Sequence, residues 1–359
     1  MKTADELTRL GRLRRIRRLA EAALADYGLS GAEVRFFCSA GNTLYRVHAP
    51  SPGVARPHDD LFEPGQYLLR VYQPSWQTPE AIELELAWLA AMRREAGLPV
   101  PEPIPRLDGR LLTHVSLPDV PEGRYVVLQR WIKGRLLPDF GNPDHYRAQG
   151  RLMAQMHNFT QRWQQQLPAK AAKRRYDWDG LFRNDPELGL PPGKCWDYLP
   201  PAWVEPFLAV SRQFRALVDA WGTGPEVYGL IHADMGLDAN LLFWHGQPRP
   251  IDFDGSGWGY WMYDLAIAVA HCIGTSDHER FWAALLDGYA EYRCLPAAQL
   301  AQWNLFTVSF YVYYILWMVG GAHYHPELLD DHLERLMYRG AAYVLPYVQH
   351  DAQAVGEHK

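Results

Sequence analysis

The stretch from Tyr228 to Ala270 constrains the fold of this chain more than any other part of the sequence. It contains two short apolar runs, Leu241 to Trp244 and Pro250 to Phe253, which are joined by the polar turn His245-Gly246-Gln247. This pattern predicts a β-hairpin. Polar side chains flank the hairpin: His232, Asp234 and Asn240 come before it, and Asp252 and Asp254 come at its close.

Such a layout is typical of a phosphoryl-transfer site. In these sites one Asp faces the acceptor hydroxyl, while an Asn and a later Asp hold the magnesium ions that neutralise the nucleotide phosphates. The sequence therefore indicates that the ends of the hairpin carry the chemistry.

The same stretch resembles the aminoglycoside phosphotransferase and choline kinase superfamily, whose bilobal fold is like that of protein kinases. In that superfamily a His-Ala-Asp loop replaces the protein-kinase His-Arg-Asp, and Ile-Asp-Phe-Asp replaces Asp-Phe-Gly. A Tyr-Asp-Leu-Ala then follows. This chain has all three in order, at His232 to Asp234, Ile251 to Asp254 and Tyr263 to Ala266, and the combination is far more specific than any one of them.

The resemblance implies an α+β, bilobal, protein-kinase-like fold. Residues 1–130 would form the nucleotide-binding lobe, with a small antiparallel sheet and one main helix. Residues 131–359 would form a large, mostly helical lobe for catalysis and acceptor binding. The length of 359 residues also favours two domains. The apolar spacing among the arginines of the first twenty residues predicts an additional helix on the smaller lobe.

The resemblance also assigns roles to residues of the hairpin region. Asp234 orients the acceptor hydroxyl and takes its proton, and His232 braces the loop around it. Asn240 and Asp252 hold Mg²⁺, and Asp254 is another candidate metal ligand.

Two details of this region lead to further expectations. The spacing from Asp234 to Asn240 is six residues, whereas five is usual, so Asp238 competes with Asn240 for the metal. Asp264 is expected to hydrogen-bond backbone groups of the catalytic loop, and His157 is expected to be a packed core histidine.

The nucleotide is expected to contact the smaller lobe. The turn Ser39 to Asn42 lies between two predicted strands, where Gly41 permits a close backbone approach to phosphate and Asn42 flanks it. Arg70 interrupts a buried strand at the position of the superfamily lysine. Its predicted partner is Glu85, on a helix that begins at Pro79.

The far end of the predicted sheet is expected to bind the base. Tyr125 to Gln129 reads as the last strand, and the segment from Arg130 to Gly134, which contains Trp131, as the linker to the larger lobe. From the order along the chain, Gln129 and Trp131 are candidate contacts to the purine.

Composition narrows the class of partner and the compartment. A net charge of -5 argues against a nucleic-acid-coating protein. The four cysteines are scattered, which predicts neither structural zinc nor disulfides and favours the cytoplasm. The run from Leu295 to Pro326 lacks charged residues, but its Tyr, Thr and Ser content favours a buried helix over a membrane span.

These observations predict an ATP- or GTP-dependent kinase with Mg²⁺ as cofactor, which phosphorylates a hydroxyl of an amino alcohol, a sugar or an antibiotic. A protein Ser/Thr kinase of the bacterial stress-response type is an alternative. Arg70 and the longer loop leave open a nucleotide-binding pseudokinase scaffold. A metal-dependent hydrolase explains less, because it does not account for the upstream strands and helix. An aminoglycoside acceptor is not preferred, because the charge-free run offers no carboxylate wall.

Overall fold

The computed structural model describes residues 8–49, 60–74, 77–118, 120–167, 173–183, 191–237, 239–324 and 331–356. The chain divides into two compact units. Unit 1 contains the N-terminal part as far as Arg135 and, in addition, Arg249–Asp254; unit 2 contains Leu136–Ala169, Lys173–Pro248 and Gly255–Lys359. The second acidic motif of the hairpin region therefore belongs to unit 1, although its neighbours in sequence belong to unit 2.

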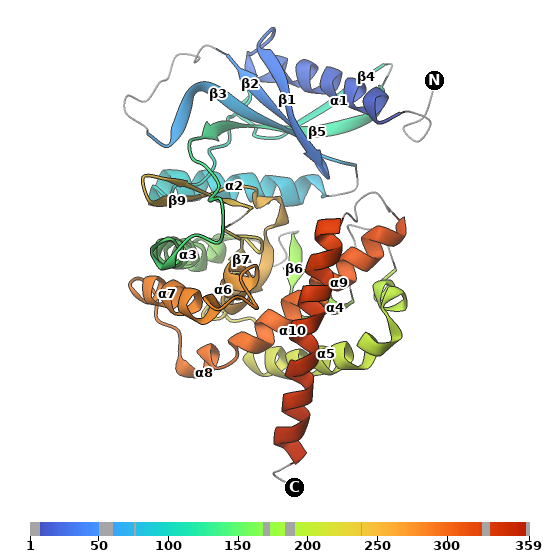
Figure 1. Cartoon of the computed structure of the whole chain (residues 1–359). Coiled ribbons are helices and arrows are strands. Elements are labelled where there is room, and N and C mark those ends of the chain that lie inside the picture. The colour runs from blue at the N-terminus through green and yellow to red at the C-terminus, as the bar shows by residue number, and fades with distance from the viewer. Residues whose placement is uncertain are drawn as a thin grey trace. The chain divides into compact units, whose positions relative to one another are not determined.

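Unit 1 is built on a five-stranded antiparallel sheet with the strand order β1-β2-β3-β5-β4 (Figure 1). Its strands are β1 (Glu33–Ala40), β2 (Asn42–His48), β3 (Phe62–Val71), β4 (Thr113–Leu117) and β5 (Val120–Ile132). The predicted turn of four small residues is tighter than expected, because Gly41 alone separates β1 from β2. Its φ of +73° is one that glycine adopts without strain.

Two helices pack on this sheet. Helix α1 (Arg9–Ala23) begins at the capping hydroxyl of Thr8 and continues into the short 3₁₀ helix η1 (Leu24–Tyr27). Helix α2 (Pro79–Ala96) has Thr78 as its N-cap, Pro79 in its first turn and Gly97 in the left-handed conformation after its end. Helix α1 is the additional helix that the arginine-rich N-terminal segment predicted, and α2 is the predicted main helix of the smaller lobe.

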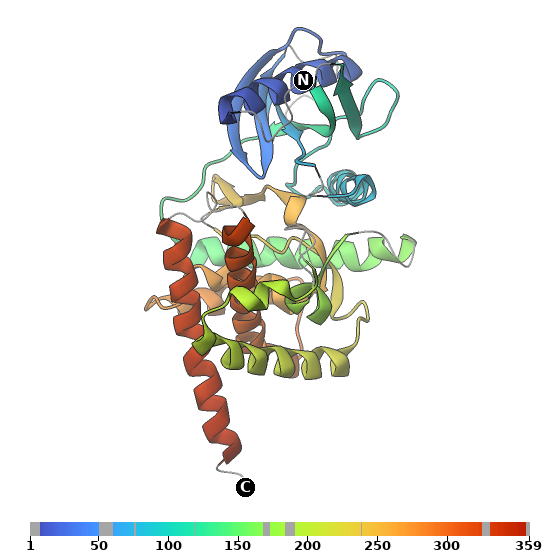
Figure 2. The ribbon, with the colours of Figure 1, turned by 90° about the vertical axis from the view of Figure 1, so that its right-hand side faces the viewer.

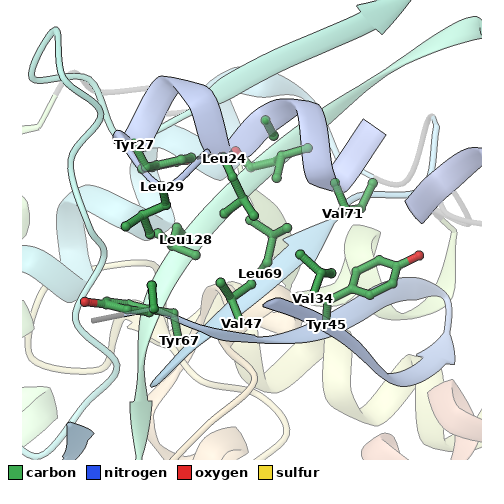
Figure 3. Close-up of a cluster of buried hydrophobic side chains, with 14 residues drawn as sticks. Leu24, Tyr27, Leu29, Val34, Tyr45, Val47, Tyr67, Leu69, Val71 and Leu128 are labelled. Atoms are coloured by element: carbon green, nitrogen blue, oxygen red, sulfur yellow. Dashed lines mark hydrogen bonds between the residues drawn. The ribbon is translucent and has the colours of Figure 1, made fainter. Parts of the chain in front are cut away.

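The core of unit 1 lies between α1 and one face of the sheet (Figure 3). Side chains alternate along each strand, so Tyr45 and Val47 face this core while Leu44 and Arg46 face the other way. Figure 3 shows the cluster, which includes Leu24, Tyr27, Leu29, Val34, Tyr45, Val47, Tyr67, Leu69, Val71 and Leu128. The opposite face of the sheet carries Arg70 and the predicted base contacts.

Unit 2 is mainly helical. Its longer helices are α3 (Pro143–Trp163), α5 (Pro201–Trp221), α6 (Trp261–Ala270), α7 (His278–Ala290), α9 (Trp303–Tyr324) and α10 (Asp331–Gly356). Figure 2 shows α5, α9 and α10, which pack together. The shorter helical pieces are η2 (Gln164–Gln166), α4 (Trp178–Phe182), η4 (Lys194–Tyr198) and α8 (Ala297–Leu300).

Two small sheets complete the architecture around the motif region. Strands β6 (Arg174–Tyr176), β10 (Gly257–Tyr260) and β7 (Tyr228–Ile231) form a three-stranded sheet in the order β6-β10-β7. Strands β8 (Leu241–Trp244) and β9 (Gln247–Pro250) form the hairpin, and the 3₁₀ turn η5 (Phe253–Gly255) follows.

The second strand of the hairpin was predicted wrongly as Pro250 to Phe253. The turn consists only of His245 and Gly246, which have φ of +48° and +75°, so Gln247 already lies in β9. A two-residue turn with both φ values positive matches the twist of antiparallel strands. The extended conformation ends before Asp252, whose φ is +62°.

The apolar segment in the C-terminal third is packed inside unit 2, as predicted. Within the described residues, Ala297–Gly321 is the one helical segment long and apolar enough to cross a membrane, and 72% of its most apolar window is buried. Helix α9 contacts α5, α6 and α10, and this packing accounts for its apolar sequence.

Helices α3 and α7 approach each other closely at two glycines, which leads to a prediction about stability. A Cβ atom added at Gly150 would lie 2.0 Å from the carbonyl oxygen of Leu285, and one at Gly288 would lie 1.9 Å from that of Arg147. Gly150→Ala should therefore lower the unfolding free energy by about 1–3 kcal/mol or more, because backbone must move. Thermal and urea unfolding would measure this loss.

The control is an ion pair that joins the same two helices. Arg151 forms a 2.7 Å ion pair with Glu291 at the end of α7, and both side chains are 43% exposed. Arg151→Ala should cost less than about 1 kcal/mol. Equal losses in the two variants would contradict the idea that close backbone packing holds these helices together.

Candidate active site

Arg70 is the buried centre of the predicted nucleotide site in unit 1. It is 2% exposed and lies on β3. Its Nη2 donates to Oδ1 of Asp252 at 2.6 Å, and its Nη1 lies 3.7 Å from Oε1 of Glu85, which is itself buried on α2. The predicted ion pair between Arg70 and Glu85 is thus present, and Asp252 adds a second carboxylate that the sequence did not connect to it.

The carboxyl group of Asp252 is unusually easy to protonate. Burial and, to a lesser extent, the charge of Asp254 raise its pKa to about 7, although Arg70 acts in the opposite direction. An acid of this kind is partly protonated near neutral pH, so a cation that binds it displaces a proton.

Asp254 is held by two amide side chains of unit 1. Asn42 Nδ2 donates to Asp254 Oδ2 at 2.7 Å, and Asn42 Oδ1 accepts from the backbone N–H of Gln73 at 3.0 Å. Gln77 Nε2 donates to the backbone oxygen of Asp254 at 2.6 Å. The side chain of Asn42 is therefore engaged by the acidic motif, and the approach of the backbone at Gly41 to a phosphate stays a prediction.

The predicted base contacts lie on the sheet face opposite α1. Gln129 is 3% exposed and pairs across the sheet with Leu68, which lies two residues before Arg70 on β3. The Trp131 ring packs edge-on against Phe37 at 5.2 Å, and the guanidinium of Arg46 lies 4.4 Å from its centre. Phe37 is 55% exposed, so the outer edge of this face is apolar and accessible.

The predicted catalytic loop of unit 2, His232 to Asp234, is held by one buried carboxylate. Asp264, in the first turn of α6, accepts a hydrogen bond from the N–H of Ala233 at 2.7 Å and a longer one from that of His232 at 3.4 Å. Ala233 has φ of +63°, which a non-glycine residue rarely adopts. The predicted contact of Asp264 with the loop backbone is confirmed, and it compensates for this strained residue.

His157 is a packed core histidine, as predicted. Its Nε2 lies 2.9 Å from Asp264 Oδ2 and its Nδ1 lies 2.9 Å from the hydroxyl of Tyr289. Because an ionised carboxylate only accepts, Nε2 carries the proton and Nδ1 accepts from Tyr289. Burial lowers the pKa of His157, and this outweighs the hydrogen bond to Asp264, which raises it.

Asp264 remains an ionised acceptor in this arrangement. Burial raises its pKa, but the hydrogen bond from His157 and the N–H of Ala233 more than offset that effect, so the net shift is downward. A neutral His157 beside an ionised Asp264 therefore holds the loop.

The catalytic loop presents Asp234 to solvent. His232 is fully buried, and its Nδ1 accepts from the N–H of Asp234 at 3.3 Å, which is the bracing role predicted for it. Asn240 Nδ2 donates to Asp234 Oδ2 at 2.7 Å and to its backbone oxygen at 3.0 Å. Asp238, the predicted competitor of Asn240, lies outside the described residues.

The structure thus gathers the predicted residues into two groups. Unit 1 brings together Arg70, Glu85, Asp252, Asp254 and Asn42, and unit 2 brings together His232, Asp234, Asn240, Asp264 and His157. Sequence reasoning missed Gln77 and also Gln149, whose Nε2 donates to the backbone oxygen of Met235 at 2.7 Å. Both bond backbone carbonyls, which have no signature in sequence.

The donor set fits a hard divalent cation. The available ligands are carboxylate and amide oxygens, which Mg²⁺ and Ca²⁺ prefer. Among the described residues, no group of three His, Cys, Asp or Glu is preassembled to hold a metal. Mg²⁺ is commonly bound by one or two carboxylates together with phosphate oxygens and water, and Asp252 and Asp254 suit that mode.

An antiparallel sheet with a buried arginine between two acids, and a braced loop that exposes an aspartate, define a kinase-like phosphotransferase. Residues 59–299 match the model of the phosphotransferase enzyme family. The chain belongs to this family, and its fold is the kinase-like fold that the sequence predicted.

Several known proteins resemble this chain over most of its length. Amicoumacin kinase of Bacillus subtilis (strain 168) is 26% identical over 296 residues, which cover 79% of this chain and 78% of the relative. A microcompartment-associated aminopropanol kinase has a TM-score of 0.73 and 27% identity, covering 94% of this chain and 98% of that one. A second amicoumacin kinase, in complex with AMP-PNP, Ca²⁺ and Ami, shares the fold with a TM-score of 0.71, 18% identity and coverage of 94% and 96%.

The His157–Asp264 pair leads to a pH prediction. The pKa of His157 in the folded protein lies below its usual value of about 6.5. As the pH falls below that value, the unfolded chain therefore binds a proton at this histidine more readily than the folded protein does. The stability contributed by neutral His157 is therefore complete above that pH and declines below it. His157→Gln should lower the unfolding free energy at pH 7.5 by about 1 kcal/mol and should also reduce the further loss on going to pH 5.5.

Denaturant unfolding of both proteins at the two pH values provides the measurement. Glutamine is a suitable replacement because its amide nitrogen still donates to Asp264 but does not titrate. Parallel pH dependence in the two proteins would show that His157 does not titrate as inferred.

Proposed function

We propose that this protein transfers the γ-phosphate of ATP to the hydroxyl of a small amino alcohol. The observation that carries the proposal is the exposed Asp234, which is fixed in a loop braced by His232 and Asp264. The resemblance to an aminopropanol kinase over 94% of the chain supports the acceptor class. Phosphate transfer from ATP favours a cytoplasmic location.

Asp234 acts as the base in this proposal. Its carboxylate receives the proton of the acceptor hydroxyl as the oxygen attacks the γ-phosphorus. The bond from this phosphorus to the β,γ-bridging oxygen breaks, and ADP leaves with the bonding electrons. Asn240 and His232 restrict the position of the side chain and of its backbone, which reduces the cost of orienting the acceptor.

Unit 1 supplies the nucleotide contacts. Arg70 Nε is buried without a hydrogen bond within the described structure, and Nη1 has only the 3.7 Å ion pair with Glu85, so a phosphate oxygen would supply an acceptor for these donors. The backbone beside Gly41 approaches the phosphates, and Gln129 and Trp131 border the base. Mg²⁺, held in this unit by Asp252 and Asp254, would neutralise charge on the phosphates.

Aromatic rings close to Asp234 suit a small cationic acceptor. The Tyr176 ring stacks on Tyr263 at 5.4 Å and meets Tyr313 of α9 edge-on at 6.1 Å. The hydroxyl of Tyr176 donates to the backbone oxygen of Gly255, and a Cβ atom at Gly255 would lie 3.8 Å from Cβ of Asp234. Tyr176 and Tyr263 are 4% and 0% exposed, so of these three rings the half-buried Tyr313 is the one that an acceptor can reach. Ring faces attract an ammonium group, so an amino alcohol bound at Tyr313 can place its hydroxyl toward Asp234.

Amicoumacin is a second candidate acceptor. It is favoured by the 26% identity to the Bacillus subtilis amicoumacin kinase over 79% of the chain. The reported relatives are named for small molecules, which favours either acceptor over a protein Ser/Thr residue. Retention of Asp234, Asn240 and Asp252 argues against a scaffold that only binds nucleotide.

The assignment of Asp234 predicts a separation of binding from chemistry. Asp234→Asn should lower kcat by a factor of about 10² to 10⁴, because it removes the base while nearly preserving shape. The Kd for Mg-ATP, measured by calorimetry, should stay close to that of the wild type. Asp219→Asn is the control, because Asp219 is 70% exposed in the same unit and should not change either quantity. Substantial turnover by Asp234→Asn would disprove the assignment.

The aromatic site predicts a preference between charged and uncharged acceptors. A screen of aminopropanol, ethanolamine, propanediol, amicoumacin, an aminoglycoside and a generic protein, with ATP or GTP, should give the highest kcat/KM for an amino alcohol with ATP. Tyr313→Leu should raise the KM of the amino alcohol by up to about tenfold and leave that of propanediol nearly unchanged.

Tyr313→Phe is the matched variant, because it keeps the ring and removes only the hydroxyl. It should retain the preference for the amino alcohol. Equal losses for both acceptors in Tyr313→Leu would mean that the ring does not recognise the ammonium group.

A further inference from the structure

Arg249 is a buried arginine with an unusual set of partners. It lies on β9, is 7% exposed and belongs to unit 1. Its Nη1 lies within hydrogen-bond distance of three backbone oxygens, at 3.2 Å from Asp60, 3.3 Å from Leu61 and 3.0 Å from Lys133. Its Nη2 also lies 3.9 Å from Oδ2 of Asp60, whose side chain is 66% exposed. Because this ion pair is long and open to solvent, the buried guanidinium is matched mainly by its hydrogen bonds to carbonyl oxygens.

These partners come from two segments that meet beside Arg249. Lys133 lies just beyond the end of β5, and its backbone N–H donates to the Leu61 oxygen at 2.9 Å. Its Nζ also donates to Oδ1 of Asp60 at 3.0 Å. Arg249 therefore caps the place where the linker segment leaves the sheet beside the start of β3.

Arg249 also lies three residues before Asp252, in the segment that carries both acids. The other end of this segment is attached separately: Phe253 packs edge-on against Trp88 of α2 at 5.6 Å, and Asp252 pairs with Arg70. The segment is thus anchored at both ends to unit 1. Loss of Arg249 would release the end nearest the linker, so that the segment would be held through its acid end alone and would move more freely.

We propose that Arg249 is a positioning residue that fixes the predicted base-binding linker and the predicted metal-binding acids relative to each other. Trp131 precedes Lys133 by two residues, so the guanidinium connects the predicted base contact to the predicted metal ligands. In the proposed site, a nucleotide with its metal would contact both segments at once. If both segments are already fixed, binding does not incur the entropic cost of ordering them. The inference rests on the proposed kinase function only for its kinetic consequence.

Steady-state kinetics with Arg249→Met provides the first test. Losing the three hydrogen bonds should raise the KM for Mg-ATP about tenfold, while the KM for the acceptor should change by less than about twofold. Arg249→Lys should restore most of the nucleotide affinity, because an ammonium group has three donors for the three oxygens. If Arg249→Met is poorly folded, Arg249→Gln, which keeps one amide donor group, should show the same selective rise to a smaller extent.

The matched control is Arg106→Met, in the same unit. Arg106 donates from Nη1 to the Leu112 oxygen at 3.0 Å and pairs with Asp26 at 3.4 Å, away from the linker. The Arg106→Met variant should have lower thermal stability without a selective change in the KM for Mg-ATP. If Arg249→Met changes kcat and both KM values in parallel, as a general loss of structure would, the positioning role is wrong.

Hydrogen–deuterium exchange gives a readout that does not depend on turnover. In Arg249→Met, amides of residues 130–135 and 249–254 should exchange faster together, and neither group should change in Arg106→Met. Faster exchange in one segment alone would overturn the proposal. A wild-type protein without kinase activity would instead refute the proposed function, and the exchange comparison would still decide the role of Arg249.

Discussion

The buried charge of Arg70 is the constraint on which the rest of unit 1 depends. A guanidinium that is 2% exposed in the middle of a sheet is tolerated only with opposite charge and hydrogen bonds beside it. Glu85 supplies one carboxylate from α2, and Asp252 supplies another from a segment far along the chain. The docking of α2 and the position of the acidic motif are therefore coupled through one side chain. Removing either acid would leave the buried charge of Arg70 with only one of these two carboxylates.

Unit 2 uses the same principle around a buried anion. Asp264 is paired with a neutral His157 and receives the N–H groups of the catalytic loop. The loop can thereby keep Ala233 in a left-handed conformation and expose Asp234 without relying on solvent. In both units a fully buried ionised group fixes a residue that the proposed chemistry needs at the surface.

The motif residues could be predicted because their spacing along the chain is nearly local, whereas partners that meet only through the fold could not. The roles of His232 and Asp264 as loop supports followed from the motif, and so did the pairing of Arg70 with Glu85. Asn42 was predicted to flank a phosphate, but the contact of its amide with Asp254 could not be predicted, because Asp254 is remote in sequence. Arg249 gave no signal, because its acceptors are carbonyl oxygens and every residue has one. The hairpin strand was misplaced because apolar residues continue past the end of β9.

The assignment of Arg249–Asp254 to unit 1 also determines how the protein can be dissected. A fragment that stops at Arg135 contains the whole five-stranded sheet but leaves the Arg70 guanidinium with only the more distant of its two carboxylates. The smaller lobe is thus discontinuous in sequence, and a short peptide carrying the acidic motif would be its missing piece. Any attempt to exchange this lobe with that of a relative has to transfer two separate stretches of gene together.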